Sequence, residues 1–228
     1  MELGGSDPFI VFNDANIAEA VDAGVFARTM NNGQSCIAAK RFILLDEIAD
    51  EFEQKFVAKM NSLVVGDPMM YETELGPIAR EDLLEELDYQ VKTSEKQGSK
   101  ILCGGKRLDR EGAFYPATVL SNVVKGNIAY TEEFFGPVAI IIRARDEADA
   151  IHIANDTPFG LGASLWTSNT ENAKQVAKEI DSGSVFINGM VKSDPRLPFG
   201  GTKISGYGRE LSHYGIKEFV NIKTVWIN

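Results

Sequence analysis

Cysteine and histidine are scarce in this sequence. Its 228 residues include two cysteines, Cys36 and Cys103, and two histidines, His152 and His213. Two cysteines are too few for a disulfide-stabilised scaffold, and this usage fits a reducing compartment, so we expect a cytoplasmic protein. Neither histidine has a metal-ligand partner at a suitable spacing, so we expect no metal site.

Long apolar runs and an excess of basic charge are missing as well. No run approaches the roughly 20 residues that a membrane-spanning helix needs, and the first residues have neither the basic nor the apolar region of a signal peptide. The 23 Lys and Arg are outnumbered by 33 Asp and Glu, which gives a net charge of -10. Such an acidic surface disfavours nucleic acid and anionic membranes, so we expect neither as a partner.

Short apolar runs alternate with helical patterns along the chain. The predicted strands cover 41–45, 100–103, 115–120, 138–144, 163–167 and 184–188, and the predicted helices cover 14–30, 47–63, 80–97, 147–155 and 170–180. Strands separated by helices indicate an α/β fold with a mostly parallel open sheet and helices on both faces. Such sheets bind ligands beyond the carboxyl ends of their strands, so we expect the functional site there.

The end of the chain has a different pattern. Residues 216–228 combine β-branched and aromatic side chains and are not followed by a helical pattern. We expect a terminal strand there, and such a strand needs an edge to pair with, here one in another subunit. We therefore divide the chain into a main domain, residues 1–212, and an oligomerisation strand, residues 213–228.

Cys36 ends a polar, glycine-containing turn between a predicted helix and a predicted strand. In such a turn substrate can reach the thiol, and the backbone N–H of Cys36 can point at an oxygen on the bound carbon. A lone cysteine is more often a small buried hydrophobic residue, and Cys103, inside an apolar strand, fits that description. Cys36 is therefore a candidate nucleophile, and Cys103 is a structural residue.

Three carboxylates lie beside glycines or aromatic residues. Glu2 begins Glu-Leu-Gly-Gly, Glu133 lies in Glu-Glu-Phe-Phe-Gly-Pro, and Glu210 ends Gly-Tyr-Gly-Arg-Glu. Glycines let a backbone approach a ligand closely. Taken singly, each acid is more often a solvated surface residue, so the argument depends on the set.

Together, the motifs of this chain resemble the aldehyde dehydrogenase superfamily. They are, in order, ELGG, GQSC, EEFFGP, PFGG and GYGRE. The spacing from Cys36 back to Glu2 and forward to Glu133 is typical of that family. The resemblance extends from Glu2 to about Trp226, which is nearly the whole chain.

The resemblance implies a role for each of these residues. Cys36 would attack the aldehyde carbon, and Glu2 would activate the water that hydrolyses the resulting thioester. Glu210 would be a second acid near the site, in a proton relay. Glu133 would hydrogen-bond the ribose of the nicotinamide cofactor, NAD or NADP, and Phe135 would pack near the nicotinamide ring.

The resemblance also implies what the chain lacks. Family members are about twice as long, and their first half holds most of the dinucleotide-binding domain and the asparagine of the oxyanion hole. No G-x-G-x-x-G follows a strand in this sequence. We therefore expect a catalytic domain, residues 1–212, that is not a competent dehydrogenase by itself. Family members are dimers or tetramers built partly through the terminal strand, so we also expect a homo-oligomer.

The segment 188–196, together with 210–215, resembles bacterial succinate-semialdehyde dehydrogenases. That substrate has a carboxylate at its far end, which Ser193 and a cation such as Arg196 or Lys192 would bind. A purely structural role for this polar loop is equally compatible, because surface cations are common. Two other functions stay open: cofactor-independent thioesterase or esterase activity of Cys36, and a non-catalytic assembly domain.

Overall fold

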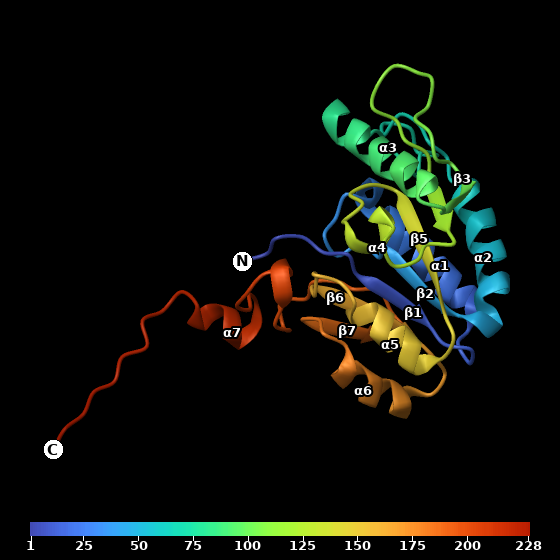
Figure 1. Cartoon of the computed structure of the whole chain (residues 1–228). Coiled ribbons are helices and arrows are strands. Elements are labelled where there is room, and N and C mark those ends of the chain that lie inside the picture. The colour runs from blue at the N-terminus through green and yellow to red at the C-terminus, as the bar shows by residue number, and fades with distance from the viewer.

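A single seven-stranded sheet forms the centre of the computed structural model, which describes all 228 residues. Its strand order is β3-β4-β5-β2-β1-β6-β7 (Figure 1). The strands are β1 (Pro8–Val11), β2 (Arg41–Leu45), β3 (Lys100–Cys103), β4 (Thr118–Ser121), β5 (Val138–Ala144), β6 (Gly162–Trp166) and β7 (Ser184–Ile187). All neighbours are parallel except β3 and β4. The predicted mostly parallel α/β sheet is therefore confirmed.

Helices cover both faces of this sheet (Figure 1). They are α1 (Ile17–Thr29), α2 (Asp46–Asn61), α3 (Glu81–Lys96), α4 (Ile128–Thr131), α5 (Glu147–Asn155), α6 (Thr170–Glu179) and α7 (Ser212–Lys217). Successive side chains of a strand point to opposite faces. In β2, the Phe42 ring packs 4.6 Å from the Phe56 ring of α2, whereas Arg41 donates to the Ile153 carbonyl of α5 at 2.9 Å. The two helices therefore lie on opposite sides.

An aromatic cluster fixes the α1–α2 layer on the sheet. Phe9, Phe42, Phe52 and Phe56 are all fully buried. Gly24 of α1 leaves space for them, because a Cβ there would lie 2.9 Å from the Phe42 ring. Burying one such ring contributes about 2–3 kcal/mol, so this cluster anchors β1 and β2, the strands next to the candidate site.

Three elements were not predicted from the sequence: β1, α4 and α7. Strand β1 is fully buried and consists of only four apolar residues. A short apolar run has no alternation that would identify it as a strand. The helices α4 and α7 have four and six residues, too short for a helical period to be recognised.

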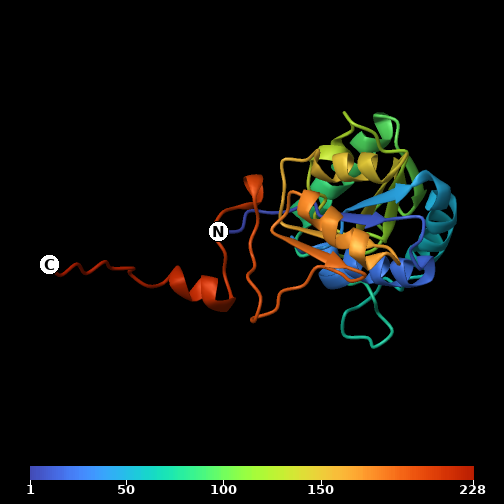
Figure 2. The ribbon, with the colours of Figure 1, turned by 90° about the horizontal axis from the view of Figure 1, so that it is seen from below.

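The C-terminal segment differs from its prediction. The proposed boundary at residue 213 falls inside α7, and residues 218–228 form neither helix nor strand and extend away from the sheet (Figure 2). Phe219 and Trp226 are 89% and 83% exposed. A strand needs a hydrogen-bonding edge, and this segment lies beside none in the single chain. Its pairing with another subunit stays a prediction. None of the helices has the length and apolarity needed to cross a bilayer.

Candidate functional site

The candidate residues gather at the amino ends of neighbouring parallel strands. Glu2 lies before β1, Cys36 before β2 and Glu133 before β5. These three strands are adjacent in the sheet, so the loops that enter them meet. The expectation that the site lies at the carboxyl ends is therefore wrong. The chemistry-bearing residues belong to the loops that lead into the strands, not to those that leave them.

Cys36 lies in an irregular turn between α1 and β2. Asn31 and Asn32 have left-handed φ values of 54° and 56°, a conformation that asparagine tolerates better than most residues. Gly33 follows with φ 72°, and a Cβ there would collide with the Gly136 carbonyl. The turn is thus set by residue type, and it leaves the Cys36 side chain half-buried.

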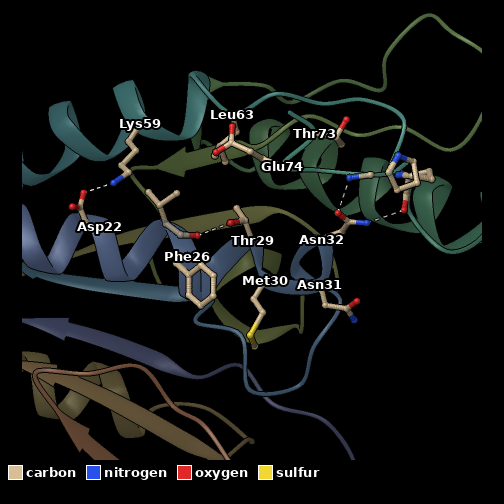
Figure 3. A pocket seen from close by; sticks show the side chains of 14 residues that line it. Asp22, Phe26, Thr29, Met30, Asn31, Asn32, Lys59, Leu63, Thr73 and Glu74 are labelled. Carbon is tan, nitrogen blue, oxygen red and sulfur yellow. Dashed lines mark hydrogen bonds and ion pairs between the residues drawn. The ribbon is translucent and has the colours of Figure 1, made fainter. Parts of the chain in front are cut away.

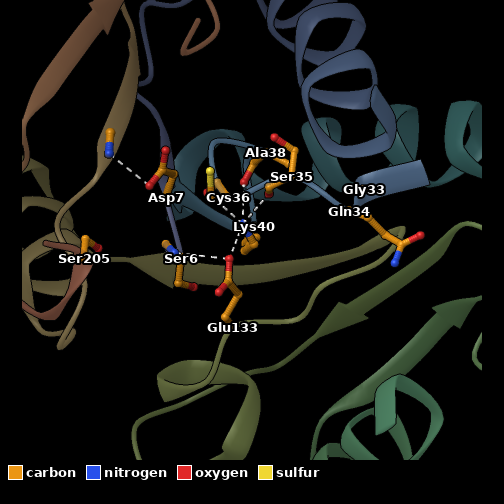
Figure 4. A network of polar contacts seen from close by, with 12 residues as sticks. Ser6, Asp7, Gly33, Gln34, Ser35, Cys36, Ala38, Lys40, Glu133 and Ser205 are labelled. Atoms are coloured by element: carbon orange, nitrogen blue, oxygen red, sulfur yellow. Dashed lines mark hydrogen bonds and ion pairs between the residues drawn. The ribbon is translucent and has the colours of Figure 1, made fainter. Parts of the chain in front are cut away.

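Lys40 ties the turn together from inside the protein, and sequence reasoning missed it. Its ammonium is fully buried and donates to the carbonyls of Ser35 at 2.9 Å, Cys36 at 3.0 Å and Ala38 at 3.3 Å (Figure 4). It also forms an ion pair with Glu133 Oε1 at 3.2 Å. The sequence did contain a signal for it: Lys40 is a cation directly before the apolar run of β2, four residues after Cys36.

Glu133 bridges Lys40 and the segment that carries Glu2. Its Oε1 accepts a hydrogen bond from the Gly5 N–H at 3.2 Å. Gly4 lies against the other carboxylate oxygen, and a Cβ at Gly4 would be 2.6 Å from Oε2. The Gly4-Gly5 pair therefore allows the backbone to approach this carboxylate, as the Glu-Leu-Gly-Gly motif suggested.

Glu2 and Glu210 are brought together by backbone contacts between distant segments. The Leu3 N–H donates to the Ser205 carbonyl at 3.0 Å, and Glu210 exchanges backbone hydrogen bonds with Phe199 at 2.7 and 2.9 Å. Burial and then the charge of Glu210 raise the pKa of Glu2 above its ordinary 4.5. A carboxylate with a raised pKa is better matched to act as a base near neutrality.

The Cys36 thiol lies within electrostatic reach of Glu2. Burial raises the pKa of the thiol, the Lys40 ammonium opposes this rise, and Glu2 and Asp7 add to it. A thiol with a raised pKa needs a proton acceptor before it can attack a carbon. The charge of Glu2 acts on that thiol, so the arrangement brings a candidate nucleophile and a candidate base into one site.

Three other buried charges support this end of the sheet and were missed by sequence reasoning. Asp7 accepts the Gly162 N–H at 3.0 Å, and burial raises the pKa of its carboxyl. Arg28 donates to the Gly33 carbonyl at 2.5 Å. Arg41 donates to the backbone carbonyls of Ser6, Ile153 and Ala154. Charged residues are rarely fully buried, so no sequence pattern singles these out.

The predicted substrate residues form a separate feature. Arg196 makes a forked pair with Asp194 through contacts of 2.9 and 2.6 Å, and its side chain is 85% exposed. Ser193 is exposed as well. The fork favours the structural role that was considered for this loop, and substrate binding by Ser193 and Arg196 stays a prediction.

Two cavities flank the site. The larger, about 850 Å³, lies between α1, α2 and the 66–77 loop and is lined by Met30 and Asn32 but not by Cys36 (Figure 3). Asn32 fixes its rim by accepting from the Gly76 N–H at 2.9 Å and donating to the Pro77 carbonyl at 3.0 Å. This cavity adjoins the turn of Cys36, but Cys36, Glu2 and Glu133 do not line it.

The smaller cavity, about 480 Å³, contains the predicted cofactor residues. It is lined by Glu133 and Phe135, together with Leu83 and Phe159. A carboxylate can accept hydrogen bonds from ribose hydroxyls, and apolar and aromatic side chains suit a flat ring. These residues fit the nicotinamide end of a dinucleotide.

Comparisons with known proteins agree with this geometry. The model of the Aldehyde dehydrogenase family matches residues 1–225. Succinate-semialdehyde dehydrogenase (NADP+) of Mycobacterium leprae is 55% identical over 227 residues, which cover 100% of this chain and 50% of that protein. Succinate-semialdehyde dehydrogenase (NADP+) 1 of Mycobacterium tuberculosis is 54% identical with the same coverage.

A solved structure extends the likeness to three dimensions. Succinic semialdehyde dehydrogenase from Streptococcus pyogenes in complex with NADP+ is similar with a TM-score of 0.96 and 40% identity, over 99% of this chain and 50% of that one. The chain therefore spans about half the length of the curated relatives it matches. By its sequence motifs, its sheet and the residues gathered at the amino ends of its strands, this chain belongs to the aldehyde dehydrogenase family.

Proposed function

We propose that the protein containing this chain oxidises an aldehyde to a carboxylic acid, with Cys36 as the nucleophile. The observation that carries the proposal is the convergence of three loops, which brings a thiol, a carboxylate base and the predicted ribose ligand to one edge of the sheet. Cys36, Glu2 and Glu133 come from segments far apart in sequence.

In the first step, the sulfur of Cys36 attacks the carbonyl carbon while Glu2 accepts the thiol proton. The C–S bond forms, and the carbonyl π electrons move onto the oxygen, giving the alkoxide form of a thiohemiacetal. The backbone N–H of Cys36 takes no part in the backbone hydrogen bonds of the turn, so it is free to donate to that oxygen.

Glu133 and Phe135 would position the nicotinamide end of the cofactor beside this carbon. When bound, an oxidised nicotinamide would supply the hydride acceptor for oxidation of this carbon to the thioester level. Lys40 and the Gly5 N–H hold one oxygen of Glu133, which leaves the second oxygen for a ligand hydroxyl.

Glu2 acts again in the last step. Having passed the thiol proton to Glu210 and on to solvent, Glu2 takes a proton from a water molecule, whose oxygen attacks the thioester carbon. The C–S bond then breaks, the acid leaves, and the proton held by Glu2 returns to the Cys36 sulfur. Burial and then the charge of Glu210 raise the pKa of Glu2, and the second of these effects supports the relay role proposed for Glu210.

The proposed substrate is succinate semialdehyde, and the proposed cofactor is NADP. Both are supported by the names of relatives more than 50% identical to this chain. The far carboxylate of that substrate would be bound by Ser193 and Arg196. Arg196 would have to exchange its pairing with Asp194 for the substrate.

The test is nicotinamide reduction, followed at 340 nm with succinate semialdehyde and NADP. It compares the 228-residue chain, a longer protein in which a cofactor-binding half precedes Glu2, and the Cys36→Ala variant of each. We expect activity in the longer protein only and its loss in Cys36→Ala. Absence of activity in the longer protein with several aldehydes would contradict the proposal.

A second candidate activity is cofactor-independent ester or thioester hydrolysis. It is favoured by the presence of both the thiol and its base within this chain. Hydrolysis of p-nitrophenyl acetate by the chain alone tests it. A rate above that of Cys36→Ala supports the hydrolase, and equal rates remove it.

We also propose that residues 213–228 associate with a second copy of the chain, giving a homo-oligomer of a cytoplasmic protein. The exposed apolar residues of this segment support association, and the two free thiols suit a reducing compartment. Deleting 218–228 should lower the mass measured by light scattering. An unchanged mass contradicts this role, and oligomers without any enzymatic activity would favour the assembly-domain alternative.

A further inference from the structure

The buried ammonium of Lys40 is surrounded by groups that belong to the site. It donates to three carbonyls of the Cys36 turn, and Glu133 is its nearest carboxylate. A lysine ammonium has three N–H groups and no acceptor. Its three protons are therefore shared among four oxygens, and every one of these oxygens lies in the turn or on Glu133.

The charges around Lys40 and around the thiol form one connected set. Burial and then the Arg28 guanidinium lower the pKa of Lys40 to about 8, and the charges of Glu133 and Asp7 oppose this fall. The thiol in turn responds to Lys40, Glu2 and Asp7. Among the charges that act most strongly on the thiol, Lys40 is the cation.

We propose that Lys40 is a positioning residue for Cys36: it holds the shape of the nucleophile's turn, favours the thiolate, and links the turn to Glu133. This rests on the proposed function in so far as Cys36 is the nucleophile. Lys40 touches no substrate. It acts through the carbonyls of Ser35, Cys36 and Ala38, and through its charge.

The link to Glu133 has a consequence for the reaction. One carboxylate neutralises Lys40, so the field that Lys40 exerts on the thiol depends on the charge of Glu133. Glu133 also favours the protonated form of Lys40, so loss of its negative charge would leave less positive charge beside Cys36. The pair therefore couples the predicted cofactor residue to the nucleophile through one buried cation.

The test measures the thiol directly, so it does not depend on dehydrogenase activity. In a Cys103→Ser background, the rate of Cys36 alkylation by iodoacetamide is followed against pH. Lys40→Met removes the cation with a side chain of similar length. We expect the inflection of the profile to rise by about one pH unit and the rate near neutrality to fall about tenfold.

Glu133→Gln gives the second expectation. It removes the charge that favours the protonated form of Lys40, so the inflection should rise, as it does in Lys40→Met. This shift should be much smaller when Lys40→Met is also present, because the cation that carries the coupling is gone. A purely structural disturbance of the turn would instead give two shifts that add.

Lys203→Met is the matched control. Lys203 also donates to two backbone carbonyls, those of Asn155 and Thr157, and it is not among the groups that act on the thiol. Its profile should match that of the parent. Circular dichroism identifies any variant that does not fold, and if Lys40→Met fails to fold, the direction of the Glu133→Gln shift decides.

An unchanged profile in folded Lys40→Met, or a fall of the inflection in Glu133→Gln, would overturn the proposal. Failure of NADP reduction with both shifts present would remove the dehydrogenase assignment and leave the role of Lys40 intact. Intact NADP reduction without the shifts would do the reverse.

Discussion

Cys36 and Glu2 lie in the same site, but the protein holds them in different ways. The turn of Cys36 is fixed by buried charged groups, above all Lys40, whose donors are satisfied by backbone carbonyls. The segment of Glu2 is exposed and is held by backbone contacts with the 205–207 segment. A buried polar network is costly to disturb, whereas exposed backbone contacts are replaced by water.

This difference suits the proposed chemistry. The nucleophile forms a covalent bond and must present one geometry, so its turn is determined by several independent contacts. The base acts on two different protons, that of the thiol and that of a water molecule. A segment with few constraints allows the Glu2 carboxylate to serve both positions.

The largest effect is expected from Arg41→Met. The Arg41 guanidinium is fully buried and donates to the Ser6, Ile153 and Ala154 carbonyls at 3.0, 2.9 and 2.9 Å. Leaving these carbonyls without donors should lower the free energy of unfolding in urea by about 3 kcal/mol or more.

The matched variant is Arg143→Met. Arg143 lies in β5, the strand next to β2, and pairs with the exposed Asp50. An exposed pair of this kind contributes about 0–1 kcal/mol. An equal loss of unfolding free energy in Arg41→Met and Arg143→Met would show that the buried arginine stabilises the fold no more than the exposed one.

Gly5→Ala tests the contact between the segment of Glu2 and the turn of Cys36. A Cβ at Gly5 would lie 2.8 Å from the Cys36 carbonyl oxygen, closer than non-bonded atoms approach. Overpacking of this kind should cost about 1–3 kcal/mol of unfolding free energy and alter the alkylation rate of Cys36. At Gly189 a Cβ would meet only the Ile187 carbonyl, at 3.9 Å, so Gly189→Ala should leave both quantities unchanged.

Asp7 makes the stability of the buried region dependent on pH. Burial raises the pKa of this carboxyl above its ordinary 3.8. As the pH rises from that value, the unfolded chain loses the proton before the folded chain does, so stability falls until the folded carboxyl has also ionised. Asp7→Asn removes this contribution.

Urea unfolding of the Asp7→Asn variant, repeated between about pH 4 and pH 8, should therefore show a smaller loss of stability with rising pH than the parent shows. A steeper loss in the variant would mean that the native Asp7 carboxylate is stabilised by Lys40 and Arg41 more than burial disfavours it.

The smallest effect is expected on the exposed side. Glu210→Gln removes the charge that helps to raise the pKa of Glu2, so this pKa should move down toward 4.5. The free energy of unfolding should change by less than about 0.5 kcal/mol. Carbon-13 NMR titration of the Glu2 carboxyl measures the shift, and an unmoved pKa would place Glu210 outside its electrostatic reach.

The sequence predicted the fold better than it predicted the electrostatics. The strands 138–144 and 41–45 were recognised because apolar runs of their length, separated by helical patterns, have few other interpretations. Cys36 and Glu2 were singled out because the set of motifs that contains them resembles that of a known family, and their catalytic roles stay predictions. Local signals of this kind survive in a single sequence.

Lys40 and Asp7 were not found, because the burial of a charge depends on partners distant in sequence. Glu133, which neutralises Lys40, belongs to a loop before another strand. The edge of the sheet was predicted wrongly for a related reason: a general rule for open sheets was applied, although each candidate residue precedes its strand rather than following it.

The placement of the site at the amino ends leaves the opposite rim of the sheet available for engineering. Strands of five to seven residues separate the two rims by about 15–20 Å. The turn after β5, which contains the exposed Arg145, lies on that far rim. A fluorophore or affinity tag inserted there would report on the protein while leaving the thiol and its base in their native surroundings.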